Sequence, residues 1–150
     1  MLPREQRLTL NRVPAVEASA ELLPFDPTRI MDLWLRDYFP EMLDREQSRY
    51  ASISEISSVM GNPVDIIPVA VPFGCHDGFL EAFYGRPEAF LDPVVRRDQS
   101  AWPLGSDEAI NRGLDRLRDD LKTGEWDRRS GHYRRAPFFL GALRLLVWNR

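Results

Sequence analysis

The sequence of 150 residues has little with which to build a covalently stapled or metal-bound protein. It contains one cysteine, Cys75, and two histidines, His76 and His132. A single cysteine cannot form an internal disulfide, and this fits a reducing compartment. His132 lies far from the other two residues in sequence, so none of the ligand spacings typical of zinc is present. We therefore expect no disulfide and no metal site.

The sequence also lacks a long apolar segment. Its longest apolar stretch, Ala136 to Trp148, is interrupted by Arg144 and is shorter than the roughly 20 residues that span a bilayer. The first ten residues carry Arg4, Glu5 and Arg7 and contain no apolar core of a signal peptide. These absences predict a soluble, cytoplasmic protein with no membrane partner.

No strong excess of one charge is present either. There are 20 Lys and Arg against 23 Asp and Glu, a net charge of -3, so general nucleic-acid binding is not expected. Hydrophobic residues make up 43% and charged residues 29%, a mixture typical of globular proteins. The length suits one compact domain with a core of its own.

Residues 1–20 show neither a helical nor a strand period, and we expect them to form a poorly structured arm. Strand patterns follow at residues 21–25, 64–71 and 143–148. Pro68 cannot donate a hydrogen bond within a sheet, so its strand is expected at an edge or with a bulge. Helical patterns fill the intervals and predict an α/β fold class with only three strands.

The helices are predicted from their amino-terminal caps. One begins at Asp26-Pro27 and ends or kinks at Pro40. Another has a capping box of Ser52 and Glu55 and stops at Gly61. The apolar stripe of the first helix consists of Ile30, Leu33, Trp34 and Tyr38.

Further helices are expected later in the chain. Asp77 is a candidate cap for a helix over residues 79–84, and Asp92-Pro93 repeats the cap-plus-proline start. The clearest helix runs from about Ser106 to Thr123, and Gly124 closes it. Its apolar face consists of Ile110, Leu114, Leu117 and Leu121.

Two stretches of the sequence resemble a known family. They are LLPFDPTRIMDLWLRDYFPEM (residues 22–42) and PVAVPFGCHDGFLEAFYGRPEAFLDP (residues 68–93), the latter continued by LKTGEWDRRSGHY (residues 121–133). Both are similar to the part of class I S-adenosylmethionine (SAM)-dependent methyltransferases that follows the fifth strand. The resemblance covers about residues 22–148.

The resemblance implies a partial Rossmann-like methyltransferase fold. The family sheet has the order 3-2-1-4-5-7-6 with strand 7 antiparallel. Residues 21–25, 64–71 and 143–148 would then be strands 5, 6 and 7, adjacent in the order 5-7-6 and covered by helices. Residues 21–150 would form the carboxy-terminal, substrate-side part of the domain, and the methyl acceptor would be a small molecule.

The family binds SAM through a glycine-rich loop after strand 1, at the carboxyl edge of the sheet. Gly74 and Gly78 follow the expected strand 6 instead, and the other glycines are scattered. SAM is therefore the cofactor that the family implies, but no residue of this chain is assigned to it. We expect the chain alone to be inactive and to pair with an amino-terminal methyltransferase half or to self-associate.

Cys75, His76 and Asp77 are three consecutive residues with side chains of catalytic type. A hydrolase triad is disfavoured, because consecutive side chains rarely point at one another. Asp77 as a helix cap and Cys75 as a small apolar filler is favoured. A third interpretation, from the resemblance, is that this loop lines a substrate pocket.

Aromatic residues at helical spacing are usually core, but they could also form a pocket wall. Tyr38 and Tyr84 are the best candidates to face a ligand, since a buried phenol needs a polar partner. No catalytic base is assigned. The full set of candidate substrate-binding residues is Asp26, Trp34, Tyr38, Cys75, His76, Asp77, Phe79 and Tyr84.

Arginines surround His132 and Tyr133 and could form a phosphate- or RNA-binding patch. Acidic residues nearby favour a solvent-exposed turn instead. The arginines are Arg128, Arg129, Arg134 and Arg135. The leading hypothesis is thus a methyltransferase portion; a non-catalytic interaction module derived from that fold is the alternative, and an RNA-associated protein is a weaker one.

Overall fold

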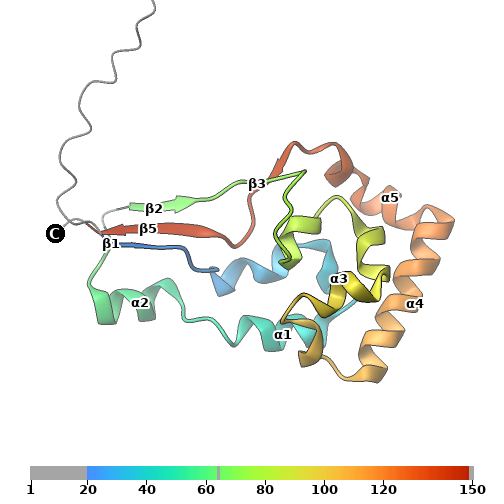
Figure 1. The fold of residues 1–150 in the computed structure, drawn as a ribbon, viewed down its shortest axis with the longest axis horizontal. Coiled ribbons are helices and arrows are strands. Elements are labelled where there is room, and N and C mark those ends of the chain that lie inside the picture. Colours follow the sequence, from blue (N-terminus) through green and yellow to red (C-terminus); the bar gives the residue numbers. More distant parts are fainter. Residues whose placement is uncertain (1–19, 64, 149–150) are drawn as a thin grey trace, which may run out of the picture.

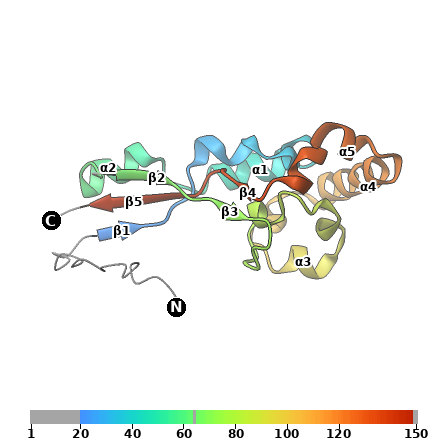
Figure 2. The same cartoon turned by 90° about the horizontal axis from the view of Figure 1, so that it is seen from above.

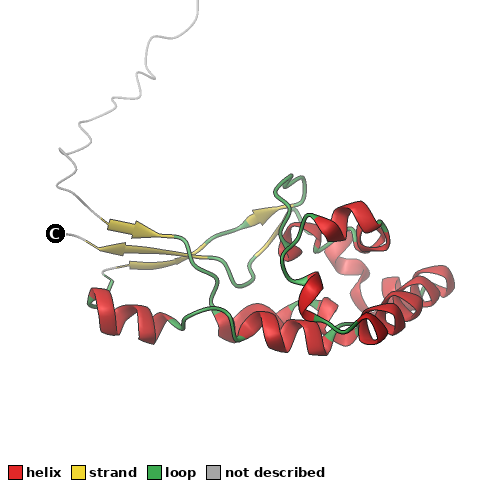
Figure 3. Cartoon of the chain, turned by 60° about the horizontal axis from the view of Figure 1, so that its bottom comes forward, coloured by secondary structure: helices red, strands yellow, loops and turns green. Residues whose placement is uncertain are grey.

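The computed structural model describes residues 20–63 and 65–148 (Figure 1). Together these residues form two parts, a small sheet and a larger group of helices. A small sheet lies at one end of an elongated molecule and most helices lie at the other (Figure 2). Figure 3 shows the same division, with strands and helices largely segregated. Apart from Ala20, the expected arm of residues 1–20 lies outside the described residues.

Three strands form the sheet in the order β1-β5-β2. They are β1 (Ala20–Leu22), β2 (Asp65–Pro68) and β5 (Arg144–Trp148), and β5 runs antiparallel to both neighbours. The expected three-stranded sheet, with the last strand central and antiparallel, is confirmed. Leu146 pairs with Leu22 on one side and with Ile66 on the other, and it is fully buried.

Prolines limit the lengths of the two outer strands. The first strand was expected to reach Phe25, but only a single bridge from Phe25 to Leu143 continues it beyond Leu22. Pro24 lies in this gap and has no N–H to donate to a neighbouring strand. Its carbonyl accepts a hydrogen bond from the Arg144 N–H. β2 lies at the sheet edge, as predicted, and ends at Pro68. The strand expected over residues 64–71 is therefore divided, because β3 (Val71–Pro72) belongs to a separate two-stranded sheet. β3 pairs with β4 (Phe138–Phe139).

Side-chain caps start three α-helices; those at Ser52 and Asp92 were predicted, and the helix expected from about Ser106 is capped by that residue. Ser52 and Glu55 form the capping box of α2 (Ile53–Met60), and Asp92 caps α3 (Pro93–Arg97). Ser106 caps α4 (Asp107–Thr123), which ends at Gly124 in the left-handed conformation. These elements follow from local sequence, because each cap side chain satisfies amide groups that the first helical turn leaves free.

Other helices differ from the expectation. The Asp26 side chain accepts from the Thr28 N–H and caps the first turn, as predicted. The single helix expected there is instead two short 3-10 helices, η1 (Pro27–Asp32) and η2 (Trp34–Asp37), and Leu33 between them is extended. Pro40 does not end a helix; it starts α1 (Pro40–Gln47). Asp77 does not cap the next helix, η3 (Leu80–Phe83), whose first residue follows Phe79 without a side-chain cap.

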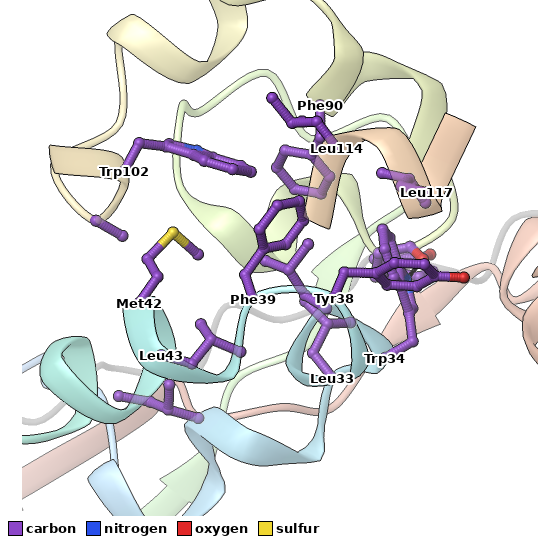
Figure 4. Packing of buried hydrophobic residues seen from close by; sticks show 14 of the residues in the cluster. Leu33, Trp34, Tyr38, Phe39, Met42, Leu43, Phe90, Trp102, Leu114 and Leu117 are labelled. Carbon is purple, nitrogen blue, oxygen red and sulfur yellow. Dashed lines mark hydrogen bonds between the residues drawn. The ribbon is translucent and has the colours of Figure 1, made fainter. Parts of the chain in front are cut away.

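The remaining helices surround a core made largely of aromatic rings (Figure 4). Trp34 meets Trp126 edge-on at 5.2 Å and Phe39 meets Trp102 at 4.9 Å, between ring centroids. Gly113 of α4 packs so closely on Phe39 that a methyl group there would collide with the ring. These helices are η4 (Pro87–Leu91), η5 (Trp102–Leu104), α5 (Glu125–Ser130) and η6 (Gly131–Arg135).

The sheet end, in contrast, exposes apolar side chains. No residue of α2 is buried, and the Val59 side chain is 85% exposed. Leu22 lies against α2 in a shallow apolar depression with Ile56 and Met60. The exposed apolar end surface comprises Leu22, Leu23, Val59, Met60, Ile66 and Ile67.

Candidate functional site

The candidate site lies where the sheet meets the helices. β1 and β2 both run toward the helical part, so their carboxyl ends face it (Figure 1). In open α/β sheets, ligands bind beyond the carboxyl ends of the strands. Phe25, three residues after β1, lines a cavity of about 180 Å³ at this junction.

Most of the cavity wall is apolar. Phe25 lies in tilted contact with Tyr50 at 5.3 Å and with Phe79 at 5.8 Å, so the three rings form one aromatic side. The apolar remainder comes from η1, α1, η3 and the segment before η5, and consists of Ile30, Leu33, Leu43, Leu80 and Ala101. Such walls with a few polar groups are typical of small-molecule sites.

Glu81 is a buried carboxyl in this wall, with only 6% of its surface exposed. Its Oε1 accepts a hydrogen bond from the Ala142 N–H at 2.7 Å, while Oε2 has no partner. A methyl group on Gly141 would collide with this carboxyl, so glycine permits the close approach. Burial raises the pKa of Glu81 to about 7, although the Ala142 N–H and the charge of Arg144 act in the opposite direction.

A second buried carboxyl, Glu46, has both oxygens satisfied. Tyr50 donates its hydroxyl to Oε1 and Arg49 donates to Oε2, each at 2.8 Å. Burial and the bond to Glu46 raise the pKa of Tyr50 to about 12, so its phenol stays protonated. Gln99, also buried in the wall, accepts from the Trp102 indole N–H at 3.1 Å, and its Nε2 has no partner.

Of the residues singled out from sequence, Phe79 lies in the cavity wall. Trp34, Tyr38 and Tyr84 lie in the helical core, and their polar atoms bond within the protein. The Trp34 indole donates to the Tyr84 carbonyl and the Tyr84 hydroxyl to the Ala136 carbonyl, both at 2.7 Å. The Tyr38 hydroxyl donates to Asp120, and burial with this bond raises the pKa of Tyr38.

The other sequence candidates lie apart from the cavity lining. Asp26 caps η1 and lies 3.9 Å from the Arg144 guanidinium. Cys75 is half-buried, and its carbonyl accepts from Arg86 at 2.8 Å. His76 and Asp77 are exposed on the loop after β3.

Three of the four clustered arginines form ion pairs with the protein's own carboxylates. Arg128 pairs with Glu125 at 2.5 Å, and Arg129 pairs with Asp120 at the same distance. Arg134 pairs with Glu88 and, at 2.6 Å, with Asp127. The charges of Arg128, Arg129 and Arg134 are thus largely compensated, whereas Arg135 is exposed. The segment is not the expected turn, because it forms α5 and η6.

Sequence reasoning missed the polar residues of the cavity, Glu46, Glu81 and Gln99. A signal for one of them was present, because Glu81 interrupts the apolar segment from Phe79 to Phe83. A carboxylate within such a segment is rarely buried without a partner or a function. The other two lie among polar neighbours in sequence and carried no comparable signal.

The described residues do not fit SAM. Gly74 and Gly78 lie in an exposed loop after β3, and Gly61 and Gly124, which have positive φ, terminate helices. None of them forms a turn from a strand into a phosphate- or cofactor-binding helix. The cavity is also smaller than the roughly 300–1,000 Å³ of pockets for drug-sized ligands.

Metal-ligand clusters and membrane-spanning helices are both absent from the described residues. Among residues 20–63 and 65–148, His, Cys, Asp and Glu side chains do not gather in threes as metal ligands would. Over the same residues, the structure has no helix with the length and apolar character needed to cross a membrane. The cytoplasmic location stays a prediction.

Comparisons with known proteins give one informative match. No protein-family model and no curated protein matches the sequence. Among solved structures, the chain is similar to a 2.40 Å crystal structure from Anabaena variabilis ATCC 29413, described as "Putative methyltransferase from antibiotic biosynthesis pathway". The TM-score is 0.77 with 28% sequence identity, over 88% of this chain and 55% of that chain. This chain thus spans about half the length of that protein, and its α/β fold is methyltransferase-like.

Proposed function

We propose that this chain forms the carboxy-terminal, substrate-side part of a class I SAM-dependent methyltransferase domain. The observation that carries the proposal is the structural similarity, over 88% of the chain, to the Anabaena protein described as a "Putative methyltransferase". In this proposal β1, β2 and β5 correspond to strands 5, 6 and 7 of that fold. The sheet order β1-β5-β2 with an antiparallel central β5 supports the assignment.

The proposed role of the chain is to hold the methyl acceptor, a small molecule. The cavity between Phe25, Phe79 and Glu81 lies beyond the carboxyl end of β1, which Phe25 follows, and this fold class binds ligands beyond the carboxyl ends of its strands. Methyl transfer depends mainly on positioning, so a fixed apolar wall contributes directly to the rate. Phe79 would contact the acceptor, and Trp34 and Tyr38 would support the wall from the core behind it.

SAM is the proposed methyl donor. The part of the methyltransferase domain that binds SAM would lie outside residues 20–148. The remaining part of the domain would pack on the exposed apolar end surface around β1 and α2. Two observations support this location. Among residues 20–63 and 65–148, β1 pairs with β5 on one side and with no strand on the other, and such an edge invites another strand. Leu22, Leu23 and Val59 beside it are exposed and apolar.

The test is a chimera in which residues 20–148 replace the aligned part of the Anabaena protein. We expect the chimera to bind SAM by isothermal titration, whereas chain 1–150 alone shows no measurable binding. A chimera carrying Leu23→Lys in the proposed interface is the matched control and should bind weakly or not at all. Tight binding of SAM by the isolated chain would refute this division of roles.

A second candidate function is a non-catalytic interaction module with the same fold. The exposed apolar end surface favours it, because that surface would bind a partner whether or not methyl transfer takes place. The chimera also separates the two functions. A folded chimera that associates through the end surface but never binds SAM would favour the interaction module.

A further inference from the structure

The polar side chains of the cavity wall offer a ligand no unpaired atom. Glu81 Oε2 and Gln99 Nε2 have no hydrogen-bond partner among the described residues, but they have almost no surface open to water and so do not face the cavity. The other polar atoms of these two side chains bond to the Ala142 N–H and the Trp102 indole. Each carboxyl oxygen of Glu46 also has a partner. A molecule in the cavity therefore meets a wall that is apolar in its binding properties.

Burial distinguishes an inner and an outer end of the cavity. Leu33, Leu43 and Ala101 are at most 2% exposed, so they form the inner end. Phe79 is half-buried and Ser100 is exposed, so they form the outer end, where the cavity reaches the surface. The part of a ligand that enters first would lie among aliphatic side chains, and the part that enters last would stay near solvent.

The volume and the rings of the wall suit one aromatic ring. An apolar cavity of about 150 Å³ is known to bind benzene, so about 180 Å³ has room for a benzene ring with one methyl-sized substituent. The Phe25 ring is tilted by 59° to Tyr50 and by 53° to Phe79. Ring edges and faces that meet at such angles pack well against another ring.

Water competes poorly for this space. A buried water typically makes about three hydrogen bonds to protein groups, and apolar cavities stay dry. The Tyr50 hydroxyl already donates to Glu46, and the two unpaired atoms of the wall are out of reach. Replacing weakly held water with an apolar group increases affinity. An apolar group is therefore favoured over a polar one at the inner end.

We propose that the cavity binds one benzene-sized ring by its apolar end, and that the polar groups of the ligand stay at the outer end near Ser100. The ligand class is a monocyclic compound that carries its polar groups on one side of the ring only. The identification of this ligand as the methyl acceptor rests on the proposed function, and its nucleophilic atom would then lie at the outer end. The binding itself does not rest on it.

The experiment titrates the full chain with two probes of nearly equal size, p-methylbenzyl alcohol and p-hydroxybenzyl alcohol. Both have one polar end, and they differ only at the opposite end of the ring. The second probe must bury one of its two polar ends without a partner. We therefore expect the methyl compound to bind about tenfold more tightly, a difference of about 1.4 kcal/mol. The amide signals of Leu43 and Ala101 should shift in NMR titrations.

A third probe separates the cavity from general apolar adhesion. p-tert-Butylbenzyl alcohol is more apolar than the methyl compound, so an apolar surface would bind it more tightly. Its substituent is too large for the inner end, and we expect its affinity to be at least tenfold weaker. This size series uses only the wild-type chain.

One variant and a matched control complete the test. Leu80→Trp places a larger side chain in the cavity wall and should weaken binding of the methyl compound more than tenfold. Glu108→Gln, on the exposed face of α4, should leave the affinity unchanged. The size series decides the proposal even where Leu80→Trp does not fold.

Equal or tighter binding of the hydroxyl compound, tighter binding of the tert-butyl compound, or no binding of any probe would overturn the proposal. So would signal shifts remote from the cavity. The assay contains no SAM, so failure of the chimera to bind SAM leaves this result unaffected. A negative result here, in turn, leaves the methyltransferase proposal with a different acceptor site.

Discussion

Replacing Glu81 with glutamine should make the protein more stable at neutral and alkaline pH and less sensitive to pH. Glutamine has nearly the same shape and keeps the oxygen that accepts from the Ala142 N–H. What it removes is a charge that burial disfavours. The folded protein raises the pKa of this carboxyl from 4.5 to about 7.

The magnitude follows from this pKa difference. Between pH 4.5 and pH 7 the folded protein keeps a proton on Glu81 that the unfolded chain has already released. The contribution of Glu81 to stability therefore falls as the pH rises through this window. At about 1.4 kcal/mol per pKa unit, the loss amounts to about 3 kcal/mol once the pH exceeds 7.

The assay is urea unfolding of wild type and Glu81→Gln at intervals from pH 4.5 to pH 8. Other carboxyls titrate in the same range, so the quantity of interest is the difference in unfolding free energy between the two proteins. That difference should move by about 3 kcal/mol in favour of the variant as the pH rises. Glu108→Gln, at an exposed position, should change by less than about 0.5 kcal/mol across the series. A difference for Glu81→Gln that does not vary with pH would refute the assignment of a buried, protonated carboxyl.

Three further changes test the packing and the end surface. Leu117→Ala on the fully buried face of α4 should cost about 2–5 kcal/mol, measured by denaturant unfolding, while Leu140→Ala at a half-exposed site should cost far less; equal effects would place Leu117 outside the core. Gly113→Ala normally stabilises a helix, but here the added methyl meets the Phe39 ring, so we expect a loss of about 1–3 kcal/mol, and a raised melting temperature would contradict the close packing. Leu23→Lys should reduce the self-association of the isolated chain in sedimentation at several concentrations, and a monodisperse monomer in both proteins would show that the β1 edge is already protected.

Local chemistry decided which elements could be predicted. The caps at Ser52, Asp92 and Ser106 depend on atoms within three residues, so their helices began as the sequence indicated. The 3-10 helices around Leu33 did not follow from periodicity. Leu33 adopts an extended conformation there, and Leu33, Trp34 and Leu35 are all buried. Tertiary packing overrode the helical period in this segment.

The candidate site depended on distant residues and could be predicted only in part. Phe79 was identified, but the main polar group, Glu81, owes its position to an amide 61 residues further along the chain. Nothing near Glu81 in sequence reveals that contact. Tyr38 and Tyr84 were expected to need partners for their hydroxyls, and these partners are Asp120 and the Ala136 carbonyl within the protein.

The central position of β5 has a consequence for how the chain folds. Ala20 pairs with Trp148, so the first and last described segments must meet before the sheet exists. The helical part also needs distant segments, since Trp34 packs on Trp126 and Phe39 on Trp102, but its individual capped helices are local and can form early. During synthesis β1 and β2 emerge before Arg144–Trp148, the strand that pairs with both of them in the part of the chain that the structure describes. Until that moment, the edges of both strands are available to any other chain that offers a strand.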